Sequence, residues 1–240
     1  MCGRYTLKTS PDVMMELFQV SSLPDLVPRY NIAPTQNVLV IRAAPDRPPE
    51  REAVWMRWGL IPFWAKDLSI GSQLINARSE TVSEKPAFRT AFAKRRCLIA
   101  ADGFYEWQKL STGRKQPWWI HQPDEAPFAM AGLWETWTER TSDNSTSDAD
   151  LPDTSRIITS CTILTTEASD DVRQLHDRMP VILPQDAWQV WLGATASPGQ
   201  LRDCLKPLSA GSLQLKCVSQ AVNRPGPESQ ELLTPVPAPE

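Results

Sequence analysis

The sequence predicts a single domain of mixed α and β structure, in which short strands outnumber short helices. The chain has 240 residues, enough to bury one full hydrophobic core without disulfide bonds. Short apolar runs, several rich in β-branched residues, recur between segments that contain glycine and proline. Residues 127–134 are predominantly small and apolar, which favours a closed or strongly curved sheet.

Helices are predicted where a proline or an N-cap residue opens an amphipathic run. Ser10 and Pro11 precede the first such run, and Pro184 and Pro198 open two others. Lys94 begins a basic triplet, which we expect to be a solvated helix end favoured by the helix dipole. The predicted helices span residues 11–18, 86–94, 168–173, 184–192 and 198–205.

Strands are predicted for runs that alternate in polarity or are rich in β-branched residues. Residues 38–41 and 53–58 are joined by a proline-rich turn over 44–50, which is typical of a hairpin with a long turn. The clearest long run covers residues 157–165. The predicted strands span residues 38–41, 53–58, 74–81, 97–101, 102–107, 127–134, 157–165, 181–183 and 213–218.

Three segments lack the period of a helix or a strand. Residues 29–36 predict an irregular loop whose polar side chains meet a ligand. Residues 139–155 are rich in Ser, Thr and Asp and predict a flexible acidic insertion. We expect the proline-rich tail over 223–240 to be loosely ordered, so that the folded domain covers 1–222.

The composition limits the classes of function. A net charge of −3 argues against a protein that coats nucleic acid with its whole surface, so a nucleic-acid site must be a local basic patch. The five cysteines are scattered without a C-x-x-C pair, and the histidines number only two. We therefore expect no disulfide framework, no metal and no cofactor. Because no signal peptide or membrane-length apolar run is present, we expect a cytoplasmic monomer without a membrane partner.

Removal of Met1 would expose a 1,2-aminothiol at Cys2. Reference pKa values of about 8 for an α-amine and about 8.5 for a thiol leave both groups partly unprotonated near neutral pH. With an aldehyde, the amine forms an imine, and the neighbouring thiol then closes a five-membered thiazolidine by an intramolecular step. Gly3 allows close approach of a ligand, and Arg4 suits a phosphate.

Five further residues are candidates for a functional site. Asn76 and Arg78 lie two positions apart in an extended segment, so their side chains point the same way. Glu106 stands between two aromatic residues, which favours a raised pKa and acid–base chemistry. His176 lies in a polar loop, and Trp64 is a candidate wedge between bases. Each has an ordinary alternative, as a strand, surface or core residue.

Six segments, taken together and in this order, resemble the SRAP family, the SOS-response-associated peptidases. They are MCGRY at 1–5, YNIAPTQ at 30–36, WGLIP at 58–62, INARSE at 75–80, ADGFYEW at 101–107 and LHDRMP at 175–180. The resemblance extends from residue 1 to about residue 183, and the combination of segments is far more specific than any one of them.

The resemblance implies an α+β fold with a curved, barrel-like, mostly antiparallel sheet and peripheral short helices. It also implies a shield for abasic sites in single-stranded DNA, including sites at junctions with duplex. In such a protein the processed N-terminal cysteine traps the ring-opened abasic deoxyribose as a thiazolidine crosslink, with weak lyase and autopeptidase activity. The implied catalytic residues are Cys2, Asn76, Glu106 and His176, and the implied DNA contacts are Arg4, Arg78, Trp64, Asn31 and Pro34.

The negative net charge requires that the DNA site be a local groove. We expect this groove to contain Arg4, Arg78 and some of Arg42, Arg57, Arg89 and Arg96. Two other functions fit the same residues. One is a cysteine peptidase that acts in trans through Cys2, His176 and Glu106, and the other is a noncovalent single-stranded-DNA module that stacks bases on tryptophans.

Overall fold

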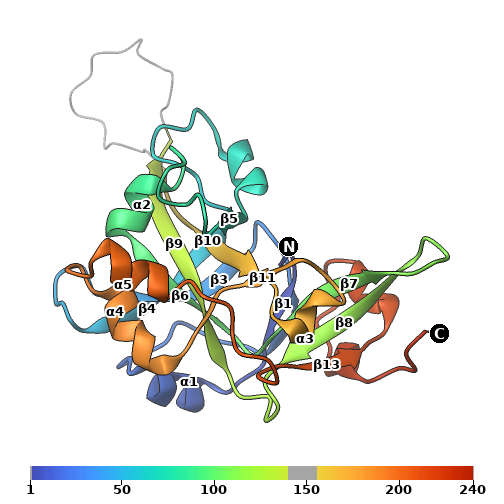
Figure 1. Ribbon diagram of the computed structural model, residues 1–240. Coiled ribbons are helices and arrows are strands. Elements are labelled where there is room, and N and C mark those ends of the chain that lie inside the picture. The colour runs from blue at the N-terminus through green and yellow to red at the C-terminus, as the bar shows by residue number, and fades with distance from the viewer. Residues whose placement is uncertain (1, 140–155, 240) are drawn as a thin grey trace.

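Five strands of the computed structural model, which describes residues 2–139 and 156–239, close on one another as a barrel (Figure 1). They are β3 (Asn37–Ala43), β4 (Arg51–Trp58), β6 (Arg96–Ala101), β9 (Phe128–Thr138) and β10 (Ile157–Glu167). β10 closes the barrel because it pairs with β9 and also, in parallel, with β4. The other neighbouring strands are antiparallel, which confirms the predicted curved and mostly antiparallel sheet.

A second, fully antiparallel sheet packs beside the barrel. Its strands follow the order β13 (Gln214–Cys217), β8 (Lys115–His121), β7 (Gly103–Lys109), β1 (Tyr5–Leu7) and β2 (Arg29–Ile32). Tyr5 of β1 meets Trp58 of β4 edge to face, with ring centroids 5.4 Å apart. Because β6 leads into β7 through Asp102 alone, the chain passes directly from the barrel into this sheet.

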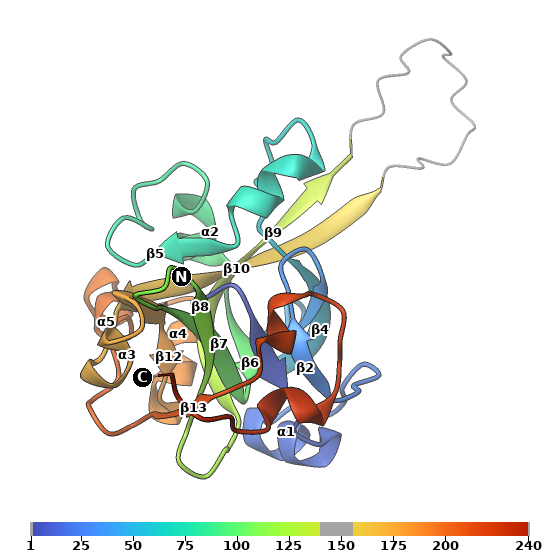
Figure 2. The ribbon, with the colours of Figure 1, turned by 90° about the vertical axis from the view of Figure 1, so that its right-hand side faces the viewer.

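The long strand β10 pairs with two short strands at its carboxyl end. It runs antiparallel beside β9 over residues 157–163, as Figure 2 shows. Beyond this point β5 (Asn76–Arg78) pairs with it in parallel and β11 (Arg178–Pro180) pairs with it antiparallel. β12 (Ile182–Leu183) then returns to β9. Segments that are remote in the sequence are therefore brought together at one end of β10.

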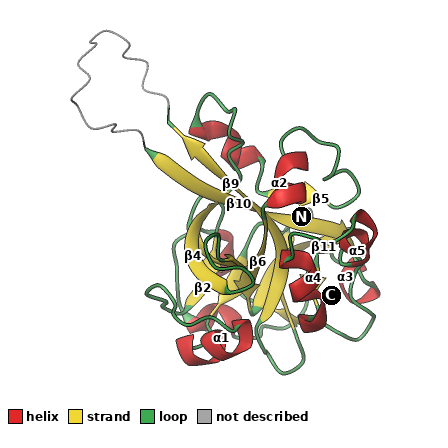
Figure 3. Cartoon of the chain, turned by 90° about the vertical axis from the view of Figure 1, so that its left-hand side faces the viewer, coloured by secondary structure: helices red, strands yellow, loops and turns green. Residues whose placement is uncertain are grey.

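The helices lie outside the strands (Figure 3). They are α1 (Pro11–Phe18), α2 (Arg89–Lys94), α3 (Asp170–Arg173), α4 (Trp188–Leu192) and α5 (Pro198–Asp203), with 3₁₀ turns η1 (Leu68–Gln73), η2 (Gln185–Ala187), η3 (Gln220–Asn223) and η4 (Gln230–Leu233). Phe18 stacks on Trp188 at 4.7 Å, and the Trp191 indole donates to the Cys97 carbonyl at 2.9 Å. Helices α2 and α4 pack against β6, all six residues of which are buried. None of the helices in the described part of the chain is long and apolar enough to cross a membrane.

Arg96 is buried, contrary to the predicted solvated helix end and to its expected place in a DNA groove. Only 7% of it is exposed, and its guanidinium donates to the carbonyls of Phe92, Ala93, Trp191 and Gly193. A guanidinium can satisfy several carbonyl groups at once, so Arg96 joins the ends of two helices. Its neighbour Arg95 pairs with Glu135 of β9.

Other differences from the sequence prediction have local causes. Residues 29–36 are not an irregular loop, because Arg29–Ile32 form β2 and pair with β1 before a turn at Pro34. Strand β8 was not predicted, since a proline and two tryptophans mask its alternation. The predicted insertion over 139–155 lies, apart from its first residue, outside the described residues.

The tail from residue 223, for which we predict loose order, makes specific contacts with the body of the fold. The Glu228 carboxylate accepts from the backbone N–H groups of Tyr30 and Asn31. Leu232 is buried, and Pro235 forms a bridge with Val218. These anchors are single residues in a proline-rich segment, so they leave no periodic signal.

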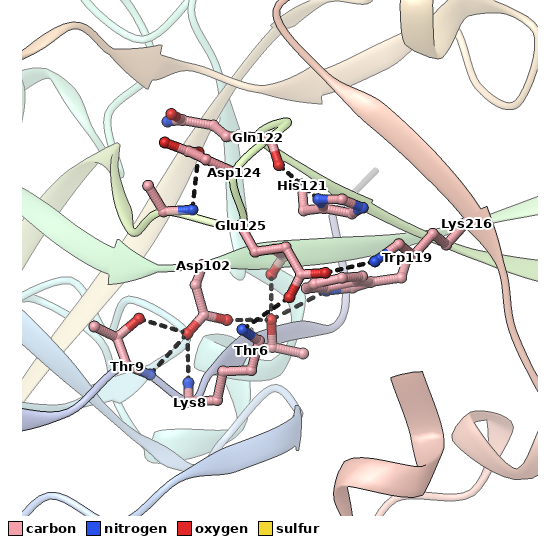
Figure 4. A network of polar contacts seen from close by, with 12 residues as sticks. Thr6, Lys8, Thr9, Asp102, Trp119, His121, Gln122, Asp124, Glu125 and Lys216 are labelled. Carbon is pink, nitrogen blue, oxygen red and sulfur yellow. Dashed lines mark hydrogen bonds and ion pairs between the residues drawn. The ribbon is translucent and has the colours of Figure 1, made fainter. Parts of the chain in front are cut away.

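A polar network fixes the start of the chain to the junction of the two sheets (Figure 4). The fully buried Asp102 carboxylate accepts from the hydroxyl groups of Thr6 and Thr9 at 2.6 and 3.0 Å and from the backbone N–H groups of Lys8 and Thr9. The Trp119 indole donates to the same Thr6 hydroxyl at 3.1 Å. A carboxylate with this many donors is held firmly, and it holds β1 in register.

Gly103 gives the first prediction, because an added Cβ would lie 2.1 Å from Nε1 of the buried Trp119. We expect Gly103→Ala to lower the free energy of unfolding by about 1–3 kcal/mol or more, as overpacking of a filled core does. Urea denaturation measures this change. In the control Gly199→Ala, in α5, the nearest atom is 3.8 Å away, so that variant should be as stable as the wild type or more stable. Equal midpoints for the two variants would contradict the argument.

Candidate active site

Cys2 lies immediately before β1 and is completely buried. Asn76 of β5 donates from Nδ2 to the Cys2 carbonyl oxygen at 2.8 Å. The carbonyl oxygen of Arg4 accepts from the Tyr105 N–H at 2.9 Å, so this end of the chain lies along β7, next to Glu106. The N-terminal residues are thus held between β5 and β7.

Asn76 also offers a polar atom that the protein does not use. Its Oδ1 is buried and has no hydrogen-bond partner within the described residues. A buried amide oxygen without a donor is costly, which is typical of a site that a ligand or a reacting group completes. Arg78, two residues further along β5, is exposed, as its position on a strand predicts.

Glu106 of β7 is 3% exposed. Burial raises the pKa of its carboxyl group, and the nearby His176 partly offsets this rise. A carboxyl group of this kind keeps a protonated fraction at a higher pH than an exposed one, so it can act as an acid as well as a base.

His176 follows α3, and backbone contacts hold its loop in place. Its Nδ1 lies 2.9 Å from the Arg178 N–H and 2.7 Å from Oδ1 of Asp177. Arg178 is anchored in turn by a two-point ion pair with Glu80, at 2.6 and 3.0 Å, and by the Thr165 carbonyl of β10. These two contacts lie at one ring nitrogen, Nδ1, and help to fix the orientation of the ring.

A cavity of about 400 Å³ connects the acid and the imidazole. Its lining residues are Glu106, Trp107, Lys115, His176 and Asn223. Residues from β7, β8, the loop after α3 and the η3 turn therefore meet at one opening. Trp107, Lys115 and Asn223 were not among the predicted site residues. Of these three, only Trp107 carried a sequence signal, since it directly follows Glu106.

The Cys2 thiol differs from the reference group on which the sequence prediction relied. Burial raises the pKa of Cys2 well above its ordinary value, and the neighbouring Glu106 carboxylate adds to the effect. The thiol is therefore kept protonated near neutral pH, and the reference value does not apply to it. Any reaction at this end of the chain has to begin with another group or deliver the thiol proton to a base.

Arg4 and Asn31 are engaged within the protein. Arg4 Nη1 donates to Asn31 Oδ1 at 2.7 Å and to the Val222 carbonyl at 2.9 Å. Asn31 is fully buried, and its Nδ2 donates to the Arg224 carbonyl at 2.8 Å. Together they fasten the tail beside the cavity, so both polar ends of the Asn31 side chain are used inside the fold.

Trp64 and Pro34, the remaining predicted contacts with DNA, are both at least partly exposed. Trp64 is 48% exposed, beside the similarly exposed Phe63. Pro34 is partly exposed in the turn after β2. Arg42 is one of the further arginines expected in the DNA groove. Its guanidinium pairs with Glu52 at 2.6 Å and lies over the Trp134 ring, so its contacts are with other side chains of the barrel.

Comparisons with known proteins identify a matching family and several relatives. The family described as SOS response associated peptidase (SRAP) matches residues 1–225. The abasic site processing protein YoaM of Bacillus subtilis is 41% identical over 237 residues, which cover 97% of each chain. The abasic site processing protein HMCES of Pongo abelii is 29% identical over 98% of this chain and 76% of its own.

Solved structures share the fold. A crystal structure of a protein from Bacteroides thetaiotaomicron has a TM-score of 0.83 at 23% identity, over 98% of this chain and 100% of that one. Another from Bordetella bronchiseptica has a TM-score of 0.71 at 32% identity, over 91% of this chain and 100% of that one.

The burial of Glu106 predicts a cost in stability. A carboxyl group with a raised pKa binds its proton more tightly in the folded state, so its contribution is most favourable below about pH 4.3 and is lost as the pH rises through the raised pKa. We expect Glu106→Gln to have a higher Tm than the wild type at pH 7–8 and a similar Tm near pH 4. Thermal denaturation against pH tests this, with Glu16→Gln on the exposed face of α1 as control. A Glu106→Gln variant that is less stable than the wild type at pH 8 would refute it.

Proposed function

Because the chain belongs to the SOS response associated peptidase family, we propose that it processes abasic sites in DNA by capturing the abasic deoxyribose covalently on Cys2. The observation that supports this most strongly is the meeting of Cys2, Asn76, Glu106 and His176 from four separate segments. The names of the relatives point to the same class of lesion. The proposed substrate is single-stranded DNA with an abasic site, bound by a monomer.

The N-terminal amine is the first nucleophile in this proposal. Removal of Met1 frees the amine of Cys2, which needs no thiolate to attack an aldehyde. The attack forms a carbinolamine, and loss of water then gives an imine. Glu106, with its raised pKa, supplies the proton that leaves with the water. This order avoids the need to ionise a buried thiol in the resting protein.

The thiol reacts second, once the imine is in place. Its sulfur bonds to the imine carbon, and the S–H proton ends on the nitrogen, so a five-membered thiazolidine forms without any other reactant. The buried Glu106 carboxylate lies near enough to influence the thiol and is suited to carry this proton. The two reacting groups belong to one residue, so the closure has the advantage of an intramolecular step.

Ring opening of the sugar precedes both steps, because an abasic deoxyribose exists mainly as the closed hemiacetal. His176 donates a proton to the ring oxygen while Glu106 removes the proton from the anomeric hydroxyl. Their common cavity supports this pairing. The buried, unsatisfied Oδ1 of Asn76 orients the Cys2 amine or a sugar hydroxyl. Arg78 and Arg4 hold flanking phosphates, with Trp64 and Pro34 against the bases.

The imine also explains a weak side reaction. Removal of a proton from the carbon next to the imine expels the 3′ phosphate by β-elimination, which breaks the strand. Addition of the thiol consumes the imine and suppresses this path. Removal of Met1 is proposed to be an autopeptidase reaction of the same site, with Cys2 as the nucleophile.

Variants of Cys2 separate these steps. With an oligonucleotide that carries one abasic site, we expect a denaturant-resistant complex for the wild type and none for Cys2→Ala. The alanine variant keeps an N-terminal amine, so cyanoborohydride should trap its imine, and its strand cleavage should rise. Denaturing gels and mass spectrometry of protein with a verified N-terminus measure all three products.

Two outcomes would reject the proposal. A stable crosslink with Cys2→Ala would place the attachment elsewhere. If the processed wild type forms no crosslink, cleavage of unrelated peptides would favour a peptidase that acts in trans. Binding of undamaged strands alone would instead favour a noncovalent module.

A further inference from the structure

The hairpin formed by β7 and β8 carries basic residues to which the proposed chemistry gives no role. It projects from the body of the fold in Figure 1. Between Glu106 and Asp124 the sequence has no acidic residue, although the whole chain carries a net charge of −3. Lys109, Arg114 and Lys115 are all exposed there. The hairpin is thus a concentrated positive feature on an acidic protein.

Two of these cations face each other across the hairpin. Lys109 and Lys115 are directly opposite in the β7–β8 register, and Arg114 adjoins them at the turn. Like charges in opposite positions of an antiparallel pair destabilise it. None of the three has an ion-pair partner in the part of the chain that the structure describes. The electrostatic repulsion between Lys109 and Lys115 is therefore not relieved by an acidic partner among the described residues.

The other end of the same sheet shows how the protein neutralises lysines where a charge is not needed. Lys216 of β13 and Lys8 both pair with the Glu125 carboxylate, the latter at 3.1 Å. Both ammonium groups also lie over the Trp119 ring, that of Lys216 at 5.2 Å and that of Lys8 at 5.7 Å from its centroid (Figure 4). No equivalent carboxylate accompanies Lys109 and Lys115 among the described residues.

The basic hairpin leads into the catalytic cavity. Lys115 lines that cavity together with Glu106 and His176. On the opposite wall, the Trp107 indole donates to Asn223 Oδ1 at 2.7 Å. Since an indole N–H can only donate, the amide oxygen of Asn223 faces it, and the amide NH₂ group remains for a ligand. An ammonium and an amide donor at one edge of a cavity suit an oxyanion.

We propose that the β7–β8 hairpin binds the phosphate backbone of the DNA strand that enters the cavity. Lys115 and Asn223 take the phosphate next to the abasic deoxyribose, and Lys109 and Arg114 take the phosphates beyond it. This inference extends the proposed function and gives the damaged strand a path along the β7–β8 hairpin into the cavity. Bound phosphates also remove the repulsion between the two opposing lysines.

The test uses single-stranded DNA with one central tetrahydrofuran, an abasic analogue that has no aldehyde. Binding is then noncovalent and does not depend on the chemistry of Cys2. We expect the triple variant Lys109→Gln/Arg114→Gln/Lys115→Gln to bind more weakly at low salt. The slope of log K against log salt should become less steep by about 0.7 for each phosphate contact removed, or about 2 in all. Fluorescence anisotropy between 50 and 200 mM salt measures the slope.

A control variant matches the change in charge. Lys85→Gln/Lys94→Gln/Arg202→Gln removes three exposed cations from the region of α2 and α5. Its salt slope should equal that of the wild type. If the two triple variants have the same slope, or if both bind like the wild type, the hairpin does not contact DNA.

A second variant separates DNA binding from folding. Lys115→Glu places opposite charges across the hairpin, so we expect a higher Tm together with weaker DNA binding. A fall in both, or no change in binding, would overturn the proposal. These binding measurements do not depend on covalent capture. If the hairpin variants bind the tetrahydrofuran DNA more weakly but the wild type forms no crosslink with a true abasic site, the proposed function is rejected and this inference is retained.

Discussion

The hydrogen bonding of one strand, β10, determines both the barrel and the site. Over residues 157–163 it pairs with β9, and Ser160 and Cys161 pair with β4, which closes the barrel. Over the following residues it pairs with β5 and β11, which bring in Asn76 and the loop of His176. A shift of register in β10 would therefore open the barrel and, at the same time, displace Asn76 and the loop of His176.

The site is assembled at some expense to the stability of the fold. A buried carboxyl group, a buried thiol and an amide oxygen without a donor lie close together, and each is unfavourable in a core. Other buried polar groups have several partners each, as Asp102 and Arg96 show.

Local patterns in the sequence predicted some of this arrangement and missed the rest. The two-residue period of a strand predicted the common side of Asn76 and Arg78, and the flanking aromatics of Glu106 favoured the raised pKa that its burial causes. The positions of Arg96 and Asn223 depend on carbonyl groups and an indole from distant segments, which no local pattern records. The exposed lysines of the hairpin carry no signal either, because their meaning depends on the register of β7 with β8.

The fastening of the tail by Arg4 has a consequence for protein synthesis. Arg4 and Val222 are in contact although they are 218 residues apart in sequence, and Asn223 forms part of the cavity wall. On the ribosome Cys2 emerges long before the residues that complete its surroundings. The assembled cavity can therefore form only after nearly all of this sequence has been made.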